Sequence, residues 1–362
     1  MWGIFKTDVI TLQYISGYLS LGTIGAFVIG GLLYEILKEK RYHLGIIIFT
    51  IIIFGSIYFT KNILKDYLFI AIITILIGFF YGLWGVLRNI LISTQIHETN
   101  LGDTKINGLA NIFFITSIII GSIVGGILAE KLSFNGIFII CILLGIGLFS
   151  GVLMNYKNLE NKNTKETALK YKQNFLADFK FILKKYSLNM VFIALIITIA
   201  TILSQKAIEY SVENLGKSGS QSAIILLYSA VGSIIGNIVS MKINENKWLY
   251  FLIFSILFAI TIYLFPTFIN NFAHTSILAF IAGIFFGITY NLLEADFFKC
   301  IAIDDKKSYG SASLGIITSL IISILMFLVD VIQRLTSFAG VYYFMGSIIL
   351  LIGIVIFSFK KS

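Results

Sequence analysis

Charged side chains are rare in this sequence, and one arginine lies where its chemistry could act inside an apolar segment. Arg88 ends a long apolar run that also contains Trp84. A charge inside such a segment is costly and by default indicates function, and an arginine can hold a phosphate with two parallel hydrogen bonds. The alternative is an arginine whose stem lies among apolar groups while its guanidinium reaches a polar surface. Asn111, on the next apolar run, could bind the same ligand or join two helices.

A second group of charged residues is spaced for contact along one helix face. Lys206 and Glu209 are three residues apart, and Tyr210 is four residues from Lys206. Residues at these spacings are neighbours on a helix. They follow an apolar run, so an ordinary ion pair at the end of that run is the simpler interpretation.

Two carboxylates, Glu294 and Asp296, lie near the end of another apolar run. Carboxylates in such positions can carry protons. The nearby Lys299 favours a structural ion pair instead.

The composition predicts that most of the chain is surrounded by hydrocarbon. Of the 362 residues, 58% are hydrophobic and 12% are charged, and the mean hydropathy is +0.94. A soluble domain carries about 25% charged residues, so this chain has too little charge to cover a water-exposed surface. Its apolar residues also come in long runs, which are typical of helices that cross a bilayer. We therefore predict an all-α membrane protein.

Eleven apolar segments come near the length that a membrane-spanning helix needs, which is roughly 20 residues for about 30 Å of hydrocarbon. They are 12–37, 44–60, 67–88, 107–129, 135–155, 188–205, 221–241, 248–268, 275–298, 309–330 and 339–358. The polar stretch 156–187 separates five segments in 1–155 from six in 188–362. The second half of that stretch has apolar residues near helical spacing, which predicts an amphipathic helix on the membrane surface.

The basic residues predict the orientation of the chain in the membrane. With 156–187 in the cytoplasm and the segments alternating in direction, 20 of the 27 lysines and arginines fall on the cytoplasmic side, as the positive-inside rule expects. The C-terminus is then cytoplasmic, and Met1 lies outside. That position of Met1 is natural if one further helix originally preceded it. Six helices in each half, with a long cytoplasmic loop between two bundles, is the arrangement of the major facilitator fold.

A short pattern near the N-terminus supports that comparison. Gly31 is followed by Glu35, Lys38 and Arg41, and this resembles the signature between the second and third helices of major facilitator transporters. In that signature the glycine lets two helices approach, and the acid and the bases pair in one conformation and separate in the other. The resemblance implies that these four residues act in gating. The alternative is an ordinary basic turn on the cytoplasmic side.

The stretch 81–129 carries a more specific pattern. It has Gly85 and Arg88 at the end of one apolar run, Asn107 and Gly108 at the start of the next, and Gly-Ser-Ile-Val-Gly-Gly over 121–126. This resembles the lysophospholipid transporter family, a branch of the major facilitators, which has a Gly-Pro-x-Lys-Tyr-x-x-Leu-Pro turn, an Ala-Asn-Gly-like helix start and a Gly-Ser-x-x-Gly-Gly ending. Arg88 stands where the family has lysine, and both prolines are absent.

The resemblance implies a function and a set of functional residues. The family moves a lipid with one acyl chain, such as lysophosphatidylethanolamine, across the inner membrane. Arg88 stands at the position thought to hold the lipid phosphate, with Trp84 and Asn111 as further candidate substrate-binding residues. Lys206 and Glu209 stand where the family has an ion pair proposed as an outer gate. A cytoplasmic acyltransferase and acyl carrier protein synthetase, which re-acylates the delivered lipid, is the implied partner.

Other classes of protein stay open. The chain could be a different major facilitator, such as an exporter of drugs or other small solutes, or a membrane-embedded lipid enzyme or scaffold. An enzyme needs a catalytic constellation, and we identify none. The three histidines are scattered without the spacing of metal ligands, and no phosphate-binding loop of the Walker type is present. We expect no cofactor, and we assign the net charge of +9 to cytoplasmic loops rather than to nucleic-acid binding.

Overall fold

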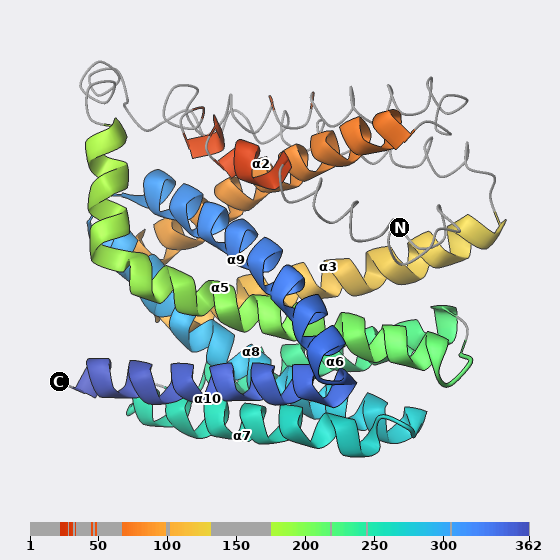
Figure 1. Ribbon diagram of the computed structural model, residues 1–362. Helices are drawn as coiled ribbons and strands as arrows, with labels where there is room; N and C mark the ends of the chain where they lie inside the picture. The colour runs from red at the N-terminus through yellow and green to blue at the C-terminus, as the bar shows by residue number, and fades with distance from the viewer. Residues whose placement is uncertain are drawn as a thin grey trace. The chain divides into compact units, whose positions relative to one another are not determined.

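The structure is a computed structural model, and all the regular structure in the residues that it describes is helical. The described residues are 22–27, 29–31, 33, 45, 48, 67–98, 102–131, 175–217, 219–243, 245–304 and 306–361. The helices are α2 (Tyr67–Glu98), α3 (Asp103–Lys131), α5 (Phe175–Glu213), α6 (Gly219–Ser240), α7 (Lys247–Phe268), α8 (Phe272–Ile303), α9 (Lys307–Leu335) and α10 (Phe338–Lys361) (Figure 1). The predicted all-α class is confirmed.

Each predicted apolar segment from residue 67 onward corresponds to one helix, where the structure describes it. By length and composition, five helices of the described part are candidates for membrane spans, namely Ala177–Glu213, Lys247–Phe268, Phe272–Ile303, Lys307–Leu335 and Phe338–Lys360. Segment 12–37 is described only in part. Segments 44–60 and 135–155 lie outside the described residues, apart from Gly45 and Ile48. The total of eleven spans, the suggested earlier helix and the division into two bundles therefore stay predictions.

Helix α5 joins two elements that the sequence suggested were separate. The amphipathic helix was expected within 156–187, but its described part, from Phe175 onward, continues without a break to Glu213. No glycine or proline interrupts this stretch, so nothing in the backbone favours a stop between the polar and the apolar part. The helix ends just before Gly216, which has a φ of +59°, a conformation that glycine adopts without strain and that commonly follows a helix C-terminus.

The chain divides into two compact units. The first comprises Met1–Leu91, Ser122–Ser187 and Asp304–Leu320, and the second comprises Ile92–Gly121, Leu188–Ile303 and Ile321–Ser362. Several helices therefore run through both units, and each unit is described here by its own contacts.

In the first unit, the described helical residues between Gly22 and Leu33 pack closely against α2. Ala26 is fully buried together with Leu83 and Leu87 of α2. The Thr23 hydroxyl donates a hydrogen bond to the carbonyl oxygen of Gly78 at 3.2 Å. Without a hydrophobic drive between helices in lipid, such tight contacts and hydrogen bonds are what hold them together.

The first unit also contains an ion-pair contact between the start of α5 and the turn after α8. Lys185 Nζ lies 2.7 Å from one carboxylate oxygen of Asp304, and the Tyr186 hydroxyl donates to the same oxygen at 2.6 Å. Desolvation by burial acts to raise the pKa of Asp304, but the hydrogen bonds from Lys185 and Tyr186 and the positive charges of Lys185 and Lys306 outweigh it and lower that pKa. Lys306 in turn pairs with Asp178 at 2.9 Å.

In the second unit, α6 and α8 pack backbone against backbone. Gly232 and Gly236 of α6 face carbonyl groups of α8, and Gly283 and Gly287 of α8 face carbonyl groups of α6. A Cβ atom at any of these four positions would overlap the facing carbonyl oxygen. Glycine at these positions therefore sets how closely the two helices approach, as is common in membrane-helix packing.

Helix α7 packs against both α8 and α10, and Figure 1 shows α10 lying alongside it. Its buried face includes Phe251, Phe258, Ile262 and Phe265, and the Phe265 ring stacks on Tyr342 of α10 with 5.3 Å between the ring centroids. This packing places the first residue of α7 and the end of α10 beside α8, which positions the charged residues described below.

Candidate functional site: a buried polar cluster between α3 and α8

Two apolar helices of the second unit turn polar faces toward each other. On α3, Asn107 and Asn111 are four residues apart, and on α8, Tyr290 and Glu294 are also four apart, with Asn291 between them. Residues at these spacings share a helix face. All but the half-buried Tyr290 are buried. We call these five residues the polar cluster.

The centre of the polar cluster is the Glu294 carboxylate, which is only 1% exposed. One of its oxygens, Oε2, accepts hydrogen bonds from Asn107 Nδ2 at 2.9 Å and from Asn111 Nδ2 at 3.0 Å. The other, Oε1, accepts a hydrogen bond from the Tyr290 hydroxyl at 2.6 Å. Hydrogen bonds to an ionised carboxylate are about twice as strong as those between neutral groups. The carboxylate therefore ties α8 to α3.

Asn291 extends this contact to a third helix. Its Oδ1 accepts from Asn107 Nδ2 at 2.8 Å. Its own Nδ2 donates to the Thr104 carbonyl oxygen at 3.0 Å and to the Ser240 hydroxyl of α6 at 2.6 Å. Gly108 allows this close approach, because a Cβ there would lie 2.8 Å from Met241 Cγ and 3.0 Å from Asn291 Nδ2.

One hydrogen-bond acceptor of the polar cluster receives no hydrogen bond from the described residues. Asn107 uses its Nδ2 in two hydrogen bonds, but its Oδ1 is buried and has no hydrogen-bond partner among the residues that the structure describes. A buried carbonyl oxygen without a donor is destabilising by about 1–3 kcal/mol. Such groups in native structures call for an explanation, and a ligand, a water or a change of state can supply one.

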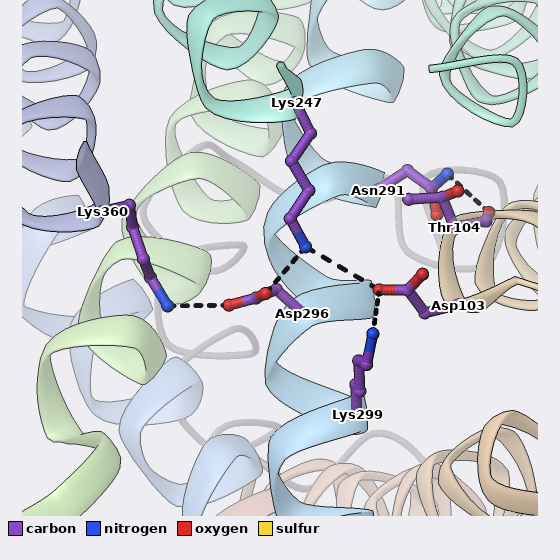
Figure 2. Close-up of polar contacts among 7 residues, drawn as sticks. All are labelled: Asp103, Thr104, Lys247, Asn291, Asp296, Lys299 and Lys360. Carbon is purple, nitrogen blue, oxygen red and sulfur yellow. Dashed lines mark hydrogen bonds and ion pairs between the residues drawn. The ribbon is translucent and has the colours of Figure 1, made fainter. Parts of the chain in front are cut away.

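Beside the polar cluster, Figure 2 shows a group of ion pairs that joins the ends of four helices. Asp296 of α8 accepts from Lys247 Nζ at 2.9 Å and from Lys360 Nζ at 2.8 Å. Asp103, at the start of α3, lies 3.8 Å from Lys247 Nζ and 4.0 Å from Lys299 Nζ. We call these five residues the lysine–aspartate network.

An aromatic ring supports the same network. The ammonium groups of Lys247 and Lys360 lie 4.9 Å and 5.1 Å from the centroid of the Trp248 ring, within the range of a cation–π interaction. The sequence had suggested that Lys299 is the partner of the α8 carboxylates, and that assignment is wrong for Asp296. Its partners are lysines 49 and 64 residues away in sequence, which only the packing of α7 and α10 on α8 brings close.

The candidate substrate-binding residues fall in different units. Asn111 lies in the polar cluster of the second unit. Arg88 and Trp84 lie on α2 in the first unit. Trp84 packs against the buried Ala26, Leu83 and Leu87, and the half-buried Arg88 donates from Nη1 to Asn89 Oδ1 at 3.0 Å. Their roles in substrate binding stay predictions.

Of the candidate gating residues near the N-terminus, the structure describes Gly31. A Cβ at Gly31 would lie 3.0 Å from the Cβ of Ala312 in α9 and 3.6 Å from the Ser308 carbonyl oxygen. Gly31 thus lies at a close contact between helices within the first unit, as a glycine of that signature does. Glu35, Lys38 and Arg41 lie outside the described residues.

The Lys206–Glu209 pair predicted from spacing is present, and it has a third member. Lys206 Nζ lies 2.9 Å from Glu209 Oε2 and 3.4 Å from Asp330 Oδ1 of α9. Lys206 is 9% exposed, so this lysine joins α5 to α9 away from bulk water. The sequence did not indicate Asp330 as a partner, because the two residues are 124 positions apart.

These observations define a class of protein. Long apolar helices, joined by buried polar side chains and with ion pairs near their ends, are the features of a multi-pass helical membrane protein. The model of the Major Facilitator Superfamily matches residues 3–298, and the chain belongs to that superfamily. It is therefore a secondary transporter that works by alternating access.

Solved transporters share the fold across nearly the whole chain. The E. coli fucose:proton symporter FucP matches with a TM-score of 0.71 at 12% identity, over 98% of this chain and 92% of that one. The human organic anion transporter MFSD10 matches with a TM-score of 0.70 at 12% identity, over 95% and 83%. The proton:xylose symporter XylE matches with a TM-score of 0.69 at 14% identity, over 96% and 86%. No curated protein matches the chain in a sequence search.

Proposed function

We propose that this transporter moves a lysophospholipid-like amphiphile, with one acyl chain and a phosphate-bearing head group, across the membrane. The observation that supports the substrate class is Arg88, a half-buried cation on the apolar helix α2. It lies in the stretch 81–129 whose motif order resembles the lysophospholipid transporter family.

The chemistry of Arg88 suits such a head group. A guanidinium offers five N–H donors in a planar fork that matches a phosphate. In this structure its Nη1 donates to Asn89 Oδ1 at 3.0 Å. The apolar side chains that flank Arg88 on α2 suit the acyl chain equally, and Tyr81 on the same helix is 55% exposed. A polar anchor for the head and an apolar route for the tail are the two parts that this substrate needs.

A second candidate substrate is a small solute. The similar structures include two symporters of a sugar with protons and one organic anion transporter, and an organic anion would use the same guanidinium. Export of drugs or other small solutes stays the alternative to lysolipid transport.

Replacing Arg88 with alanine should abolish most uptake of labelled lysophosphatidylethanolamine into proteoliposomes that contain the purified protein. Charge-assisted hydrogen bonds contribute about 1.5–3 kcal/mol each, so the initial rate should fall at least about tenfold. Arg88→Lys, which keeps the charge but loses the fork, should retain part of the rate.

Arg334→Ala is the matched control, because Arg334 is an exposed arginine at the end of α9 and its loss should leave the rate unchanged. Equal rates for wild type and Arg88→Ala would remove Arg88 from the mechanism. Absence of uptake by the wild type, with uptake of a sugar or an organic anion instead, would replace the substrate by the second candidate.

The proposal includes a location and a partner. We place the protein in the inner membrane with a cytoplasmic C-terminus, on the strength of the positive-inside distribution of lysine and arginine. A lysolipid delivered to the inner leaflet has to be re-acylated, and a cytoplasmic acyltransferase and acyl carrier protein synthetase is the proposed partner for that step.

The orientation predicts which cysteines react from outside the cell. In a variant with Cys141 and Cys300 replaced by serine, a cysteine at Asn163 should react with a membrane-impermeant maleimide only after the cells are permeabilised. Asn214→Cys, at an exposed residue just after α5, should react in intact cells because it lies on the opposite side. Labelling of Asn163→Cys in intact cells would reverse the orientation.

A further inference from the structure

The first turns of α5 present a basic face that the protein itself does not cover. Lys184 lies four residues after Lys180 and three after Phe181, so these three side chains share one side of the helix. All three are exposed, Phe181 to 43%. On the opposite side, Ile182 and Tyr186 are 0% and 6% exposed. The apolar side of this amphipathic helix therefore packs within the protein, and Lys180, Phe181 and Lys184, which we call the basic face, point outward.

The described carboxylates near the basic face do not neutralise it, because each of them holds another lysine. Asp178 pairs with Lys306 at 2.9 Å, and Asp304 pairs with Lys185 at 2.7 Å. The two lysines of the basic face form no ion pair among the residues that the structure describes. The ammonium group of Lys185 also lies 5.4 Å from the centroid of the Phe181 ring. Lysines around an exposed aromatic ring are typical of helices that bind the surface of an anionic membrane.

The length of α5 explains how the basic face reaches the surface of the bilayer. The helix has 39 residues and is about 58 Å long, whereas the hydrocarbon core of a bilayer is about 30 Å thick. Its uncharged apolar part is the segment 188–205, so the charged start belongs outside the hydrocarbon. Lys180 and Lys184 precede that segment by eight and four residues in the same unbroken helix, a rise of at most about 12 Å. Both ammonium groups are therefore within reach of the lipid phosphates.

We propose that the basic face of α5 binds the head groups of anionic phospholipids, such as phosphatidylglycerol, at the bilayer surface where α5 enters the membrane. The ammonium groups of Lys180 and Lys184 attract the negatively charged surface. The Phe181 ring between them lies at the boundary between head groups and acyl chains, where aromatic side chains of interfacial helices are buried. The lipid bound here belongs to the surrounding membrane and is not the transported substrate. The inference therefore goes beyond the proposed function and does not depend on it.

A fluorophore beside the basic face can report its contact with lipid. Ala177 is exposed and lies four residues before Phe181, on the same side of the helix. Ala177→Cys, in a variant with Cys141 and Cys300 replaced by serine, carries a nitrobenzoxadiazole label, and the full-length protein is placed in nanodiscs. As phosphatidylglycerol replaces phosphatidylcholine, up to equal parts of each, the emission should shift to shorter wavelength. High salt should reverse the shift, because it screens charges at the surface.

Lys180→Gln combined with Lys184→Gln should weaken the binding of phosphatidylglycerol about 20-fold, since each lysine near an anionic surface contributes about a fivefold factor. Lys105→Gln combined with Lys242→Gln is the matched control, because it removes the same charge at two exposed lysines elsewhere in the chain. This control should keep the response of the starting protein. Phe181→Ser should reduce the size of the shift at equal parts of the two lipids, because the lysines alone do not bring the helix below the head groups.

The proposal is wrong if the emission does not respond to phosphatidylglycerol, or if the double variant of the basic face responds as strongly as the control pair. Inorganic phosphate added to nanodiscs of phosphatidylcholine alone should cause no shift. A shift with inorganic phosphate would identify a site for a free anion and would also overturn the proposal. Because no transport is measured, these outcomes are independent of which substrate the transporter accepts, and a failure of lysolipid uptake leaves the lipid-binding measurement unaffected.

Discussion

Replacing Gly236 with alanine should strongly destabilise the folded protein, because a Cβ atom at this position has no room beside α8. Its Cβ would overlap the carbonyl oxygen of Ile284 and lie 3.1 Å from Gly287 Cα. Both are backbone atoms of α8, so no side chain can rotate away to make room. Overpacking a close contact costs about 1–3 kcal/mol, and Gly236→Leu should cost more. Thermal unfolding of the detergent-solubilised protein, followed by its loss from the monodisperse chromatography peak, measures the effect.

Gly25→Ala is the matched control for this prediction. A Cβ at Gly25 would lie 3.7 Å from the Phe79 ring, which is an ordinary van der Waals contact. Because alanine has the higher helix propensity by about 1 kcal/mol, Gly25→Ala should keep or raise the unfolding temperature. A Gly236→Ala protein that is as stable as the Gly25→Ala protein would show that α6 and α8 do not depend on backbone contact.

The long apolar runs predicted the helices well because the bilayer sets their length and excludes other structures. The run 248–268 matches α7 to within a residue at each end, for example. The start of the helix that contains segment 188–205 was predicted less well. The hydropathy pattern places its start at 188, but α5 begins at Phe175, because a helix does not have to end where its surroundings change from water to lipid.

The candidate site was predicted only in part, and the reason is geometric. Asn111 was identified because a polar residue on an apolar helix is conspicuous, and the polar spacing of Asn107 on the same helix carried the same signal. Which residues they meet could not be deduced, since Asn111 and Glu294 are 183 positions apart. Neighbouring charges were therefore assigned to each other along the chain. The structure instead pairs Asp296 with residues of α7 and α10.

Replacing Asp296 with alanine should produce the second large loss of stability. Asp296 is 8% exposed and is the carboxylate between Lys247 and Lys360. Its removal takes the paired carboxylate from Lys360 and leaves Lys247 with Asp103 at 3.8 Å, while both ammonium groups stay beside Trp248. Breaking a buried ion pair costs about 3–5 kcal/mol and an exposed one about 0–1 kcal/mol. Because both lysines are partly exposed, we expect about 2 kcal/mol, measured by the same thermal unfolding assay.

The lysine–aspartate network also predicts the stability of a double variant, because most of the stability lost in Asp296→Ala comes from the positive charges that remain. Asp296→Ala combined with Lys360→Ala should be more stable than Asp296→Ala alone, since the ammonium group that lost its paired carboxylate is gone. Glu245→Ala, an exposed carboxylate two residues before Lys247, should have no measurable effect and controls for the loss of a negative charge. If the double variant is less stable than Asp296→Ala, the network does not hold α10 to α8 by charge compensation, and Lys360 then acts mainly through its packing on Trp248.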